Sequence, residues 1–509
     1  MGRHPRERAV HFEDTWYSWA QIGTTVKRLE DALAQAALPH RARVGLVARN
    51  TPSFVAGLLT LIAGEYSIVM VYPFQSPASI AHDILAADLD AVIADARDWT
   101  TETIDAAREL ELLAVSIGKL ENPIESLHQP DFPHQPDSLH RLDFPHQPDS
   151  PRRPMAQHGR ERGEPVIELL TSGTTGRPKR ISMSFAAIER AMVTETSQVS
   201  TVNPSTLPPA LMMFPFGNIS GLYSYLPMAA AARPVVLLEK FSVTAWVNFV
   251  REYRPAHMNV PPAGVRMILD AQTDPADLKS LRFMFSGAAR LDPTAQVEFL
   301  QRYNVPILLS YGATEFGGVV TLMTPELLEK FGVAKLTSVG RPWAGTDLRV
   351  VDANSGAQLP PEQTGILEVK APRCGPDWIR TTDLASIDAD GFIYHHGRAD
   401  GAINRGGFKI IPEIVADKLA QHPSVSAVAV VGIPDARLGE IPVAAVEPRA
   451  GAPRPSEQEL RDYARANLPK THVPVHFKIV DRIPRTPSLK VHLPGVRELF
   501  ESDGEDTAS

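Results

Sequence analysis

Short apolar runs alternate with helical patterns over residues 1–115, and this alternation constrains the fold more than any other feature of the chain. Residues 44–48 and 67–71 have the apolar composition of buried strands, whereas residues 17–37 and 53–64 have the spacing of helices. Strands separated by helices usually pair in parallel, with the helices packed on the sheet. The N-terminal part is therefore predicted to be an α/β fold with parallel strands.

A segment rich in Pro, His, Asp and Gln interrupts this pattern at residues 122–160. The peptide at residues 131–138 recurs at residues 143–150, and apolar residues are sparse throughout the segment. Because such a composition cannot bury much core, we expect an extended surface insertion. Binding of a metal or a partner by His134 and His146 is the alternative.

Strand and helix patterns resume at Val166 and continue to about residue 397. A compact set of strands and helices then occupies residues 401–495, where Ser456 and Glu459 form a capping box at a helix start. We therefore predict a large N-terminal α/β region with several subdomains, residues 1–397, and a small mobile α+β domain, residues 401–509.

Composition excludes several classes of function. The net charge of −8 gives no electrostatic reason to expect nucleic acid as a partner. The chain starts with charged residues and no apolar stretch behind them, and Glu65 interrupts its best apolar run, at residues 54–72. We therefore expect no signal peptide and no membrane span. The single cysteine, Cys374, suits a reducing cytoplasm.

The loop at residues 171–179 concentrates hydroxyl groups, glycines and cations between a strand and a helix that Ser184 would cap. Glycines let a backbone approach an anion closely, and N–H groups and hydroxyls can then hold it. The spacing is neither that of a Walker A loop nor that of a dinucleotide-binding fingerprint. From the residues alone, a phosphate-binding loop and a plain polar turn both remain open. The candidate residues are Thr171, Ser172, Gly173, Thr174, Thr175, Gly176 and Lys179.

This loop resembles the phosphate-binding motif of the adenylate-forming superfamily, which contains acyl-CoA synthetases, peptide-synthetase adenylation domains and beetle luciferases. Further motifs similar to those of the family follow in its order. They are the adenine-lining segment Ser286-Gly287-Ala288-Ala289, the segment Tyr311-Gly312-Ala313-Thr314-Glu315, the ribose-binding Asp383, the hinge motif Gly397-Arg398-Ala399-Asp400 and the lysine motif of residues 484–490. The resemblance spans about residues 10–495, apart from the insertion, and implies the family's fold.

The resemblance also implies a reaction and residue roles. Enzymes of this family use ATP and Mg²⁺ to convert a carboxylic acid into an acyl-adenylate, with release of pyrophosphate. Lys490 would bridge the carboxylate and the α-phosphate, which Thr314 would also contact. Glu315 and Thr174 would hold Mg²⁺, and Thr174, Thr175 and Lys179 would steady the pyrophosphate. Asp383 and Arg398 would bind the nucleotide, and Asp400 would be the hinge.

The acyl pocket implied by the resemblance is mostly apolar, which favours an aromatic, alicyclic or medium-chain acid. Its residues are Phe216, Asn218, Met258, Val260, Phe316 and Gly317. Asn218 stands where the family usually has His. Peptide-synthetase domains that take α-amino acids usually have an Asp shortly after the Phe of this segment. No acidic residue follows Phe216 as far as Leu222, so the resemblance disfavours an amino-acid substrate.

Gly406, Gly407 and Phe408 lie in a stretch that resembles the acyl-CoA synthetase version of its motif and suits a narrow pantetheine passage. Coenzyme A is therefore the expected acceptor, and a carrier-protein thiol or an amine is the alternative. Thr382 and Leu489 stand where the family usually has Gly. Together with Asn218, these departures leave a non-catalytic nucleotide-binding protein as a further alternative.

Overall fold

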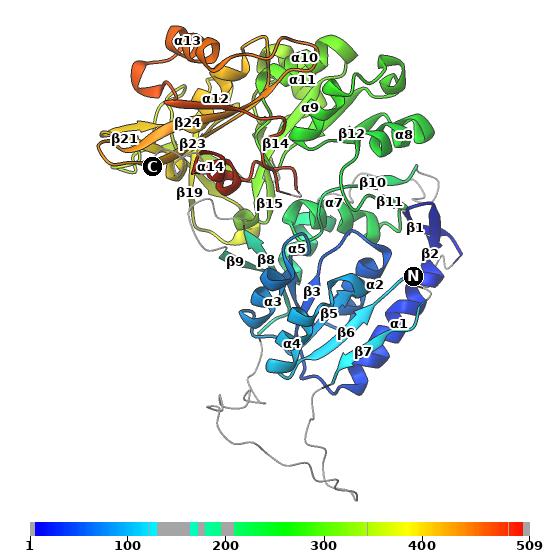
Figure 1. The fold of residues 1–509 in the computed structure, drawn as a ribbon. Helices are drawn as coiled ribbons and strands as arrows, with labels where there is room; N and C mark the ends of the chain where they lie inside the picture. The colour runs from blue at the N-terminus through cyan, green and yellow to red at the C-terminus, as the bar shows by residue number, and fades with distance from the viewer. Residues whose placement is uncertain are drawn as a thin grey trace, which may run out of the picture. The chain divides into compact units, whose positions relative to one another are not determined.

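The structure is a computed structural model that describes residues 6–120, 122–129, 163–171, 179–194, 208–343, 345–486 and 488–501. It divides into two compact units (Figure 1). The first comprises residues 1–170 and 182–185, and the second comprises residues 171–181 and 186–509. Most of the insertion and the core of the phosphate-loop candidate, residues 172–178, lie outside the described residues.

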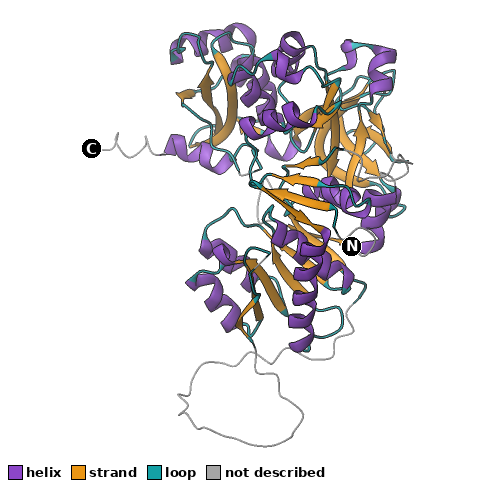
Figure 2. Ribbon diagram, turned by 90° about the vertical axis from the view of Figure 1, so that its right-hand side faces the viewer, coloured by secondary structure: helices purple, strands orange, loops and turns teal. Residues whose placement is uncertain are grey.

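A largely parallel sheet forms the centre of the first unit. Its strand order is β7-β6-β5-β3-β4-β8-β9, and β7 runs antiparallel to β6. The elements are β1 Arg8–Phe12, β2 Thr15–Ser18, α1 Trp19–Gln35, β3 Arg43–Val47, α2 Pro52–Ala63, β4 Ser67–Val71, α3 Pro77–Leu85, β5 Ala91–Asp95, α4 Thr101–Glu109, β6 Leu113–Ile117, β7 Glu125–His128, β8 Val166–Thr171 and β9 Lys179–Ser184. Figure 2 shows helices on both faces of this sheet, as expected where the strand order reverses at β3.

Strand β7 corrects the predicted start of the insertion at residue 122. Val115 of β6 pairs with Ser126, and Ala114 pairs with His128, so residues 125–128 belong to the edge of the sheet. The strand is short and polar, and its sequence lacks the apolar alternation that would have identified it.

The second unit begins with short elements and a mixed sheet. The elements are α5 Phe185–Ile188, β10 Ala210–Met212, α7 Ile219–Ala230, β11 Val235–Leu237, α8 Val243–Tyr253, β12 His257–Asn259, α9 Pro262–Asp270, β13 Phe283–Ser286, α10 Pro293–Tyr303, β14 Ile307–Ala313, β15 Gly318–Leu322, α11 Pro325–Phe331 and β16 Arg341–Pro342. Strands β12, β13 and β14 are parallel, and β15 and β16 continue the sheet antiparallel. The predicted helix after Ser184 begins as α5 and continues as a π-helix at residues 189–194.

Two further sheets complete the second unit. One has the order β17-β18-β19-β20, and the other has the order β22-β21-β24-β23, with β25 paired to β24. The elements are β17 Asp347–Val351, β18 Gly365–Lys370, β19 Ile379–Ile387, β20 Ile393–Arg398, β21 Ile403–Arg405, β22 Phe408–Ile410, α12 Pro412–Ala420, β23 Val425–Asp435, β24 Gly439–Pro448, α13 Glu457–Asn467, β25 His476–Ile479 and α14 Leu493–Glu501.

The last sheet packs its own core against α12 and α13, with Ile410, Val415, Leu460 and Phe477 buried. The predicted capping box is present at α13, where Ser456 and Glu459 exchange hydrogen bonds. An N-terminal α/β region and a smaller α+β region are thus both present, which confirms the predicted fold class. The boundary predicted at residues 397–401 stays a prediction.

Candidate active site

A largely buried carboxylate, Asp383, joins three strands of the second unit. It lies on β19 opposite Arg398 of β20, the strand that also carries His395. The hydroxyl of Tyr311, from the end of β14, donates to Asp383 Oδ2 at 2.5 Å. His395 Nε2 lies 3.2 Å from Asp383 Oδ1. The predicted residues Tyr311, Asp383 and Arg398 therefore share one site, together with His395, which sequence reasoning missed.

The pKa shifts in this cluster assign the protons. Burial and the charge of Asp383 raise the pKa of Tyr311 well above its usual value, so its hydroxyl keeps its proton. Burial alone would raise the pKa of Asp383, but hydrogen bonds from His395 and Tyr311 hold it below its usual value. An ionised carboxylate has about four acceptor sites. Since Tyr311 and His395 use one on each oxygen, roughly two are left, enough for the two hydroxyls of a ribose.

The segment after β13 approaches β14 closely. A Cβ at Gly287 would lie 2.5 Å from Ser310 Oγ, so only glycine fits there without a shift. Ala288 has a φ of 67°, and Ser286 Oγ donates to the carbonyl of Val260 at 2.9 Å. This geometry gives the segment a defined path beside β14. Contact of Gly287, Ala288 and Ala289 with adenine stays a prediction.

Thr314, Glu315 and Phe316 form a 3₁₀ turn directly after β14. The turn closes through Gly317, whose φ is 68° and whose N–H donates to the carbonyl of Thr314 at 3.0 Å. A Cβ at Gly312 would lie 2.3 Å from the carbonyl oxygen of Gly318, so the approach of β14 to β15 requires glycine. The two strands thereby place Thr314 and Glu315 directly after the carboxyl end of β14.

Lys490 and Glu315 are close enough to interact electrostatically. Burial lowers the pKa of the Lys490 ammonium group, and the charge of Glu315 acts in the opposite direction. Within the described ranges, no three His, Cys, Asp or Glu side chains gather as a metal site of their own. Glu315 still fits Mg²⁺, because this ion is usually held by one or two carboxylates together with substrate phosphates and water.

A tight turn presents Lys490. Thr486 N–H donates to the carbonyl of Lys490 at 2.7 Å, and Leu489 N–H donates to the carbonyl of Thr486 at 2.8 Å. Leu489 has a φ of 63°, in the left-handed region that favours glycine. Leu489, where the family usually has glycine, therefore places a branched side chain in strained backbone. Pro487 lies outside the described residues.

Arg398 forms a two-pronged ion pair with Asp400, the predicted hinge residue. The distances are 2.9 Å from Nε to Oδ1 and 2.7 Å from Nη2 to Oδ2. A hydrogen bond with Thr382 also lowers the pKa of Asp400, although the bond from Arg398 is the larger cause. Thr382 lies inside β19, directly before Asp383.

The predicted acyl residues lie at two places in the second unit. Met258 and Val260 lie on and after β12, with Val260 N–H donating to the carbonyl of Phe285 at 2.9 Å. Phe216 packs edge-on against Tyr225 with ring centroids 5.1 Å apart. A Cβ at Gly318 would lie 2.8 Å from the ring of Tyr223, so helix α7 packs close to the start of β15, beside Phe316 and Gly317.

Asn218 precedes α7 as its N-cap residue, but its side chain makes no capping hydrogen bond. An asparagine at an N-cap usually accepts a hydrogen bond from the first turn of its helix, and the Asn218 side chain does not do so here. Its role in contacting an acyl group stays a prediction.

Gly406 and Gly407 connect β21 to β22, since Arg405 pairs with Phe408 across them. Their φ values are 55° and 89°, as in the two-residue hairpin turn that needs φ above zero at both positions. The backbone conformation of the turn thus explains both glycines by itself, in addition to the predicted passage for pantetheine. Phe408 is 58% exposed, which is unusual for a phenylalanine that only stabilises a core.

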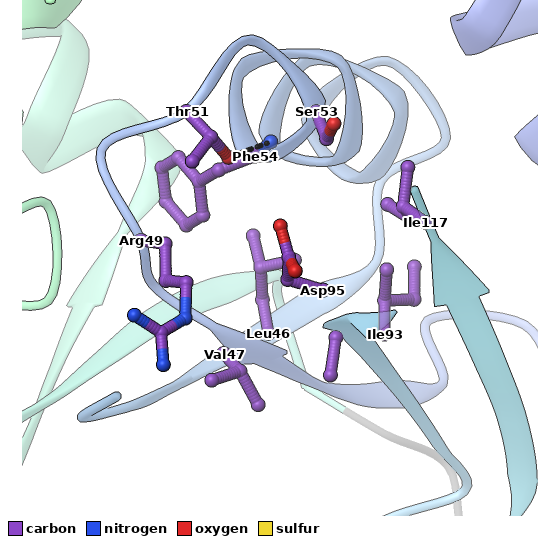
Figure 3. A pocket seen from close by; sticks show the side chains of 10 residues that line it. Leu46, Val47, Arg49, Thr51, Ser53, Phe54, Ile93, Asp95 and Ile117 are labelled. Carbon is purple, nitrogen blue, oxygen red and sulfur yellow. Dashed lines mark hydrogen bonds between the residues drawn. The ribbon is translucent and has the colours of Figure 1, made fainter. Parts of the chain in front are cut away.

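The first unit contains a small pocket at the end of β3 that matches none of the predicted residues (Figure 3). Its lining includes Leu46, Phe54, Ile93 and Ile117, and it offers about 10 Å³ of water-accessible space. This volume suits roughly one water molecule rather than a nucleotide.

No helix among the described residues is long and apolar enough to cross a bilayer.

Comparisons with known proteins match this arrangement over nearly the whole chain. Residues 1–375 match the AMP-binding enzyme family, and residues 415–490 match the AMP-binding enzyme C-terminal domain. An indoleacetate–CoA ligase of Aromatoleum aromaticum is 27% identical over 519 residues, covering 98% of this chain and 96% of that protein. A feruloyl-CoA synthase of Amycolatopsis is 27% identical over 515 residues, covering 97% and 96% of the two chains.

Solved structures show the same fold. That of o-succinylbenzoate CoA synthetase from Bacillus subtilis with its acyl-adenylate superposes with a TM-score of 0.73 at 20% identity, over 97% of this chain and 96% of the other. That of ATP-bound MatB from Rhodopseudomonas palustris superposes with a TM-score of 0.77 at 20% identity, over 98% and 97%. Because the family match covers most of the residues, the chain belongs to the AMP-binding enzyme family.

Proposed function

We propose that the protein activates a carboxylic acid with ATP and transfers the acyl group to coenzyme A. The observation that carries this proposal is the gathering of Tyr311 and Arg398 around Asp383, with the charge of Glu315 acting on Lys490, in a chain that matches the family at both ends. These are the groups that hold a nucleotide and compensate charge between two anions.

In the first half-reaction, a carboxylate oxygen bonds to the α-phosphorus while the bond from that phosphorus to pyrophosphate breaks. Both reactants are anions, so a preorganised cation lowers the barrier by stabilising the charge that gathers between them. Lys490 supplies this cation, and Thr314 donates its hydroxyl to the α-phosphate. Glu315 and, by resemblance, Thr174 would hold Mg²⁺, which would neutralise the phosphate charge when bound. Asp383 accepts the ribose hydroxyls and thereby fixes the nucleotide.

In the second half-reaction, the thiol of coenzyme A attacks the acyl carbon, AMP leaves, and the thiol proton passes to solvent. The β21–β22 turn with Gly406 and Gly407, and the exposed Phe408, would border the thiol's path. Curated relatives named as ligases for indoleacetate, ferulate and succinylbenzoate support coenzyme A as acceptor. They also support an aromatic or similarly apolar acid, which fits the buried Phe216, Met258 and Phe316.

A carrier-protein thiol or an amine is the second candidate. A fatty acid–[acyl-carrier-protein] ligase of Streptomyces coeruleorubidus is 28% identical over 361 residues, covering 67% of this chain and 68% of that protein. An amide bond synthetase of Marinactinospora thermotolerans shares the fold with a TM-score of 0.73.

A panel of arylacetic, cinnamic, alicyclic and medium-chain acids, scored by ATP-dependent pyrophosphate release, tests the first half-reaction. Adding coenzyme A, a phosphopantetheinylated carrier protein or an amine separately then identifies the acceptor. Thioester formation only with coenzyme A is expected. Pyrophosphate release with a product only from the carrier or the amine would transfer the proposal to the second candidate. Nucleotide binding without turnover of any acid would indicate a non-catalytic protein.

A further inference from the structure

His395 meets the nucleotide-site carboxylate from a neighbouring strand. Strands β19 and β20 are antiparallel, and a register shift after Leu384 brings His395 toward Asp383 rather than only toward its partner Ala385. The distance from His395 Nε2 to Asp383 Oδ1 is 3.2 Å. Side-chain exposure is 20% for His395 and 13% for Asp383, so solvent screens this contact only in part.

The contact has a defined direction. The carboxylate of Asp383 is ionised and already accepts from Tyr311, so it has no proton to donate to the imidazole. His395 Nε2 must therefore carry the hydrogen and donate it. The ring is also held by Tyr311, whose ring centroid lies 5.7 Å away at 30°. Two contacts thus orient the imidazole, and the imidazole and the phenol together hold both carboxylate oxygens.

We propose that His395 is a positioning residue that fixes the rotation of the Asp383 carboxylate for binding the ribose hydroxyls of ATP. The inference rests on the proposed function, because the nucleotide is its ligand. A carboxylate held by one donor alone can turn about its Cβ–Cγ bond and lose alignment with a pair of neighbouring hydroxyls. A second donor on the other oxygen removes this freedom and keeps one acceptor site on each oxygen for the ribose.

The adjacent His396 offers a matched control. Its Nε2 lies 2.9 Å from Ser386 Oγ, so it bonds a different strand residue and none of the site residues named above. Both histidines lie on β20, and a Phe at either position tests the same kind of change.

The experiment compares ATP with 2′,3′-dideoxy-ATP in the wild type and in His395→Phe, His395→Gln and His396→Phe. His395→Phe keeps a ring beside Tyr311 but removes the donor. It should raise the KM for ATP about tenfold, the scale of a hydrogen bond to a charged group, with kcat changed much less. His395→Gln places an amide N–H near the position of Nε2 and should recover most of the loss.

The dideoxy nucleotide supplies the deciding comparison. It lacks the hydroxyls that Asp383 would bind, so wild type and His395→Phe should use it equally poorly, as a coupled pair does in a double-mutant cycle. An equal penalty with both nucleotides, or a similar effect from His396→Phe, would overturn the proposal and assign His395 a merely structural role.

Titration calorimetry with the same two nucleotides separates this inference from the proposed function. If the wild type and His395→Phe both bind ATP more tightly than the dideoxy analogue, and by the same factor, the role of His395 is refuted while the proposed function stands. A wild type that binds neither nucleotide would refute the proposed function.

Discussion

Lys490 is a cation whose surroundings lower its pKa. Burial lowers its pKa, and Glu315 only partly compensates. Nearby anions stabilise the protonated form of a desolvated ammonium group. The carboxylate and the phosphate of the reactants would therefore raise the pKa of Lys490 when they bind. The charge of Lys490 is thus better stabilised in the complex with both anions than in the free protein.

Lys490→Ala should reduce acyl-adenylate formation by roughly a hundredfold or more, the scale for losing one preorganised charge donor. Thioester formation from supplied acyl-adenylate should fall far less, because that step has no second anion to neutralise. Single-turnover assays of the two half-reactions measure this difference. Equal losses in both would indicate misfolding or a shared role, which the thermal unfolding curve of the variant distinguishes.

The lowered pKa of Lys490 also predicts the pH dependence of adenylation. The active form is protonated, so kcat/KM for ATP should fall as the pH rises through the Lys490 pKa of the free enzyme, which burial lowers from its usual value. Lys490→Arg, which stays protonated, should have a lower rate without this alkaline decline. A decline of the same shape in the arginine variant would assign the titration to another group.

Leu489 lies at a φ of 63°, so its side chain costs free energy that glycine would avoid. Leu489→Gly should therefore be more stable than Leu489→Ala by about 1 kcal/mol in free energy of unfolding, because alanine keeps the backbone strain while losing the same contacts. Denaturant unfolding of the two variants measures the difference. An alanine variant as stable as the glycine variant would show that the turn changes conformation without the leucine.

At the scale of whole elements, period and length allowed α1, α2, β3, β4 and the helices of the last sheet to be located from the sequence. Helix α1 repeats its apolar face regularly because one face packs on a core. Elements α2, β3 and β4 are instead nearly continuous apolar runs, because they are buried almost throughout. Strand β7 could not be found this way, since it lies at an edge and half of its residues are exposed. Edge strands need fewer apolar residues, so their sequences resemble loops.

The candidate site was predictable only in part for a related reason. Motifs located Tyr311, Asp383 and Lys490 one at a time. Tyr311 and Asp383 are separated by 72 residues and lie in different sheets, so their contact depends on how the two sheets pack together. His395 carries no motif of its own. Its distance from Asp383 follows from a register shift between β19 and β20, which local sequence does not specify.

The bounds of β7 sharpen a prediction about the insertion. Replacing residues 131–160 with a short Gly-Ser linker should preserve adenylation and change the melting temperature little, because this part has few apolar residues to contribute to a core. A longer deletion that starts at residue 126 also removes most of β7 and should lower stability. A folded 131–160 variant without adenylation would assign a function to the repeat.

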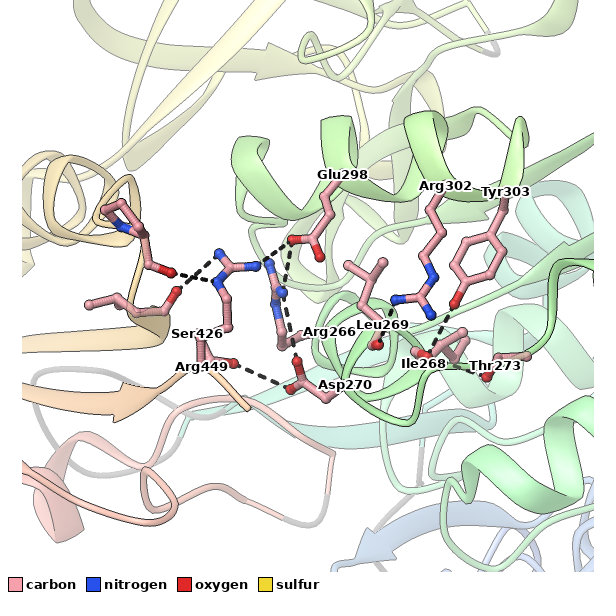
Figure 4. Close-up of polar contacts among 12 residues, drawn as sticks. Arg266, Ile268, Leu269, Asp270, Thr273, Glu298, Arg302, Tyr303, Ser426 and Arg449 are labelled. Atoms are coloured by element: carbon pink, nitrogen blue, oxygen red, sulfur yellow. Dashed lines mark hydrogen bonds and ion pairs between the residues drawn. The ribbon is translucent and has the colours of Figure 1, made fainter. Parts of the chain in front are cut away.

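At the scale of the whole molecule, the second unit holds its last sheet against helices α9 and α10 through a network of ion pairs (Figure 4). Glu298 Oε2 accepts from Arg266 at 3.0 Å and from Arg449 at 2.9 Å, and Ser426 donates to Asp270 at 3.3 Å. Arg290 and Asp417 form a further pair. These contacts are polar, and the Arg449–Glu298 and Arg290–Asp417 pairs are partly exposed, so they can separate at a lower cost than an apolar interface.

Two segments of the last sheet's region would serve different half-reactions. The charge of Glu315 acts on Lys490, whereas Gly406 and Gly407 form the turn between β21 and β22. The arrangement with Lys490 near Glu315 suits adenylation. Thioester formation would require Lys490 to withdraw, and the polar network of Arg266, Glu298 and Arg449 to separate, while the chain turns at Asp400.

Asp400→Pro tests this rotation. Proline holds φ near −65° and removes an N–H, so the hinge could no longer absorb a large change of backbone angle. Asp400→Pro also removes the ion pair with Arg398, which Asp400→Ala removes without restricting φ, so alanine is the matched control. If proline is compatible with the adenylating geometry, both variants should form acyl-adenylate at similar rates, and only the proline variant should be slow in thioester formation. Separate assays of the two half-reactions on purified protein measure this. Undiminished thioester formation by Asp400→Pro would refute rotation at this residue, and equal slowing by Asp400→Ala would assign the effect to the Arg398 ion pair instead.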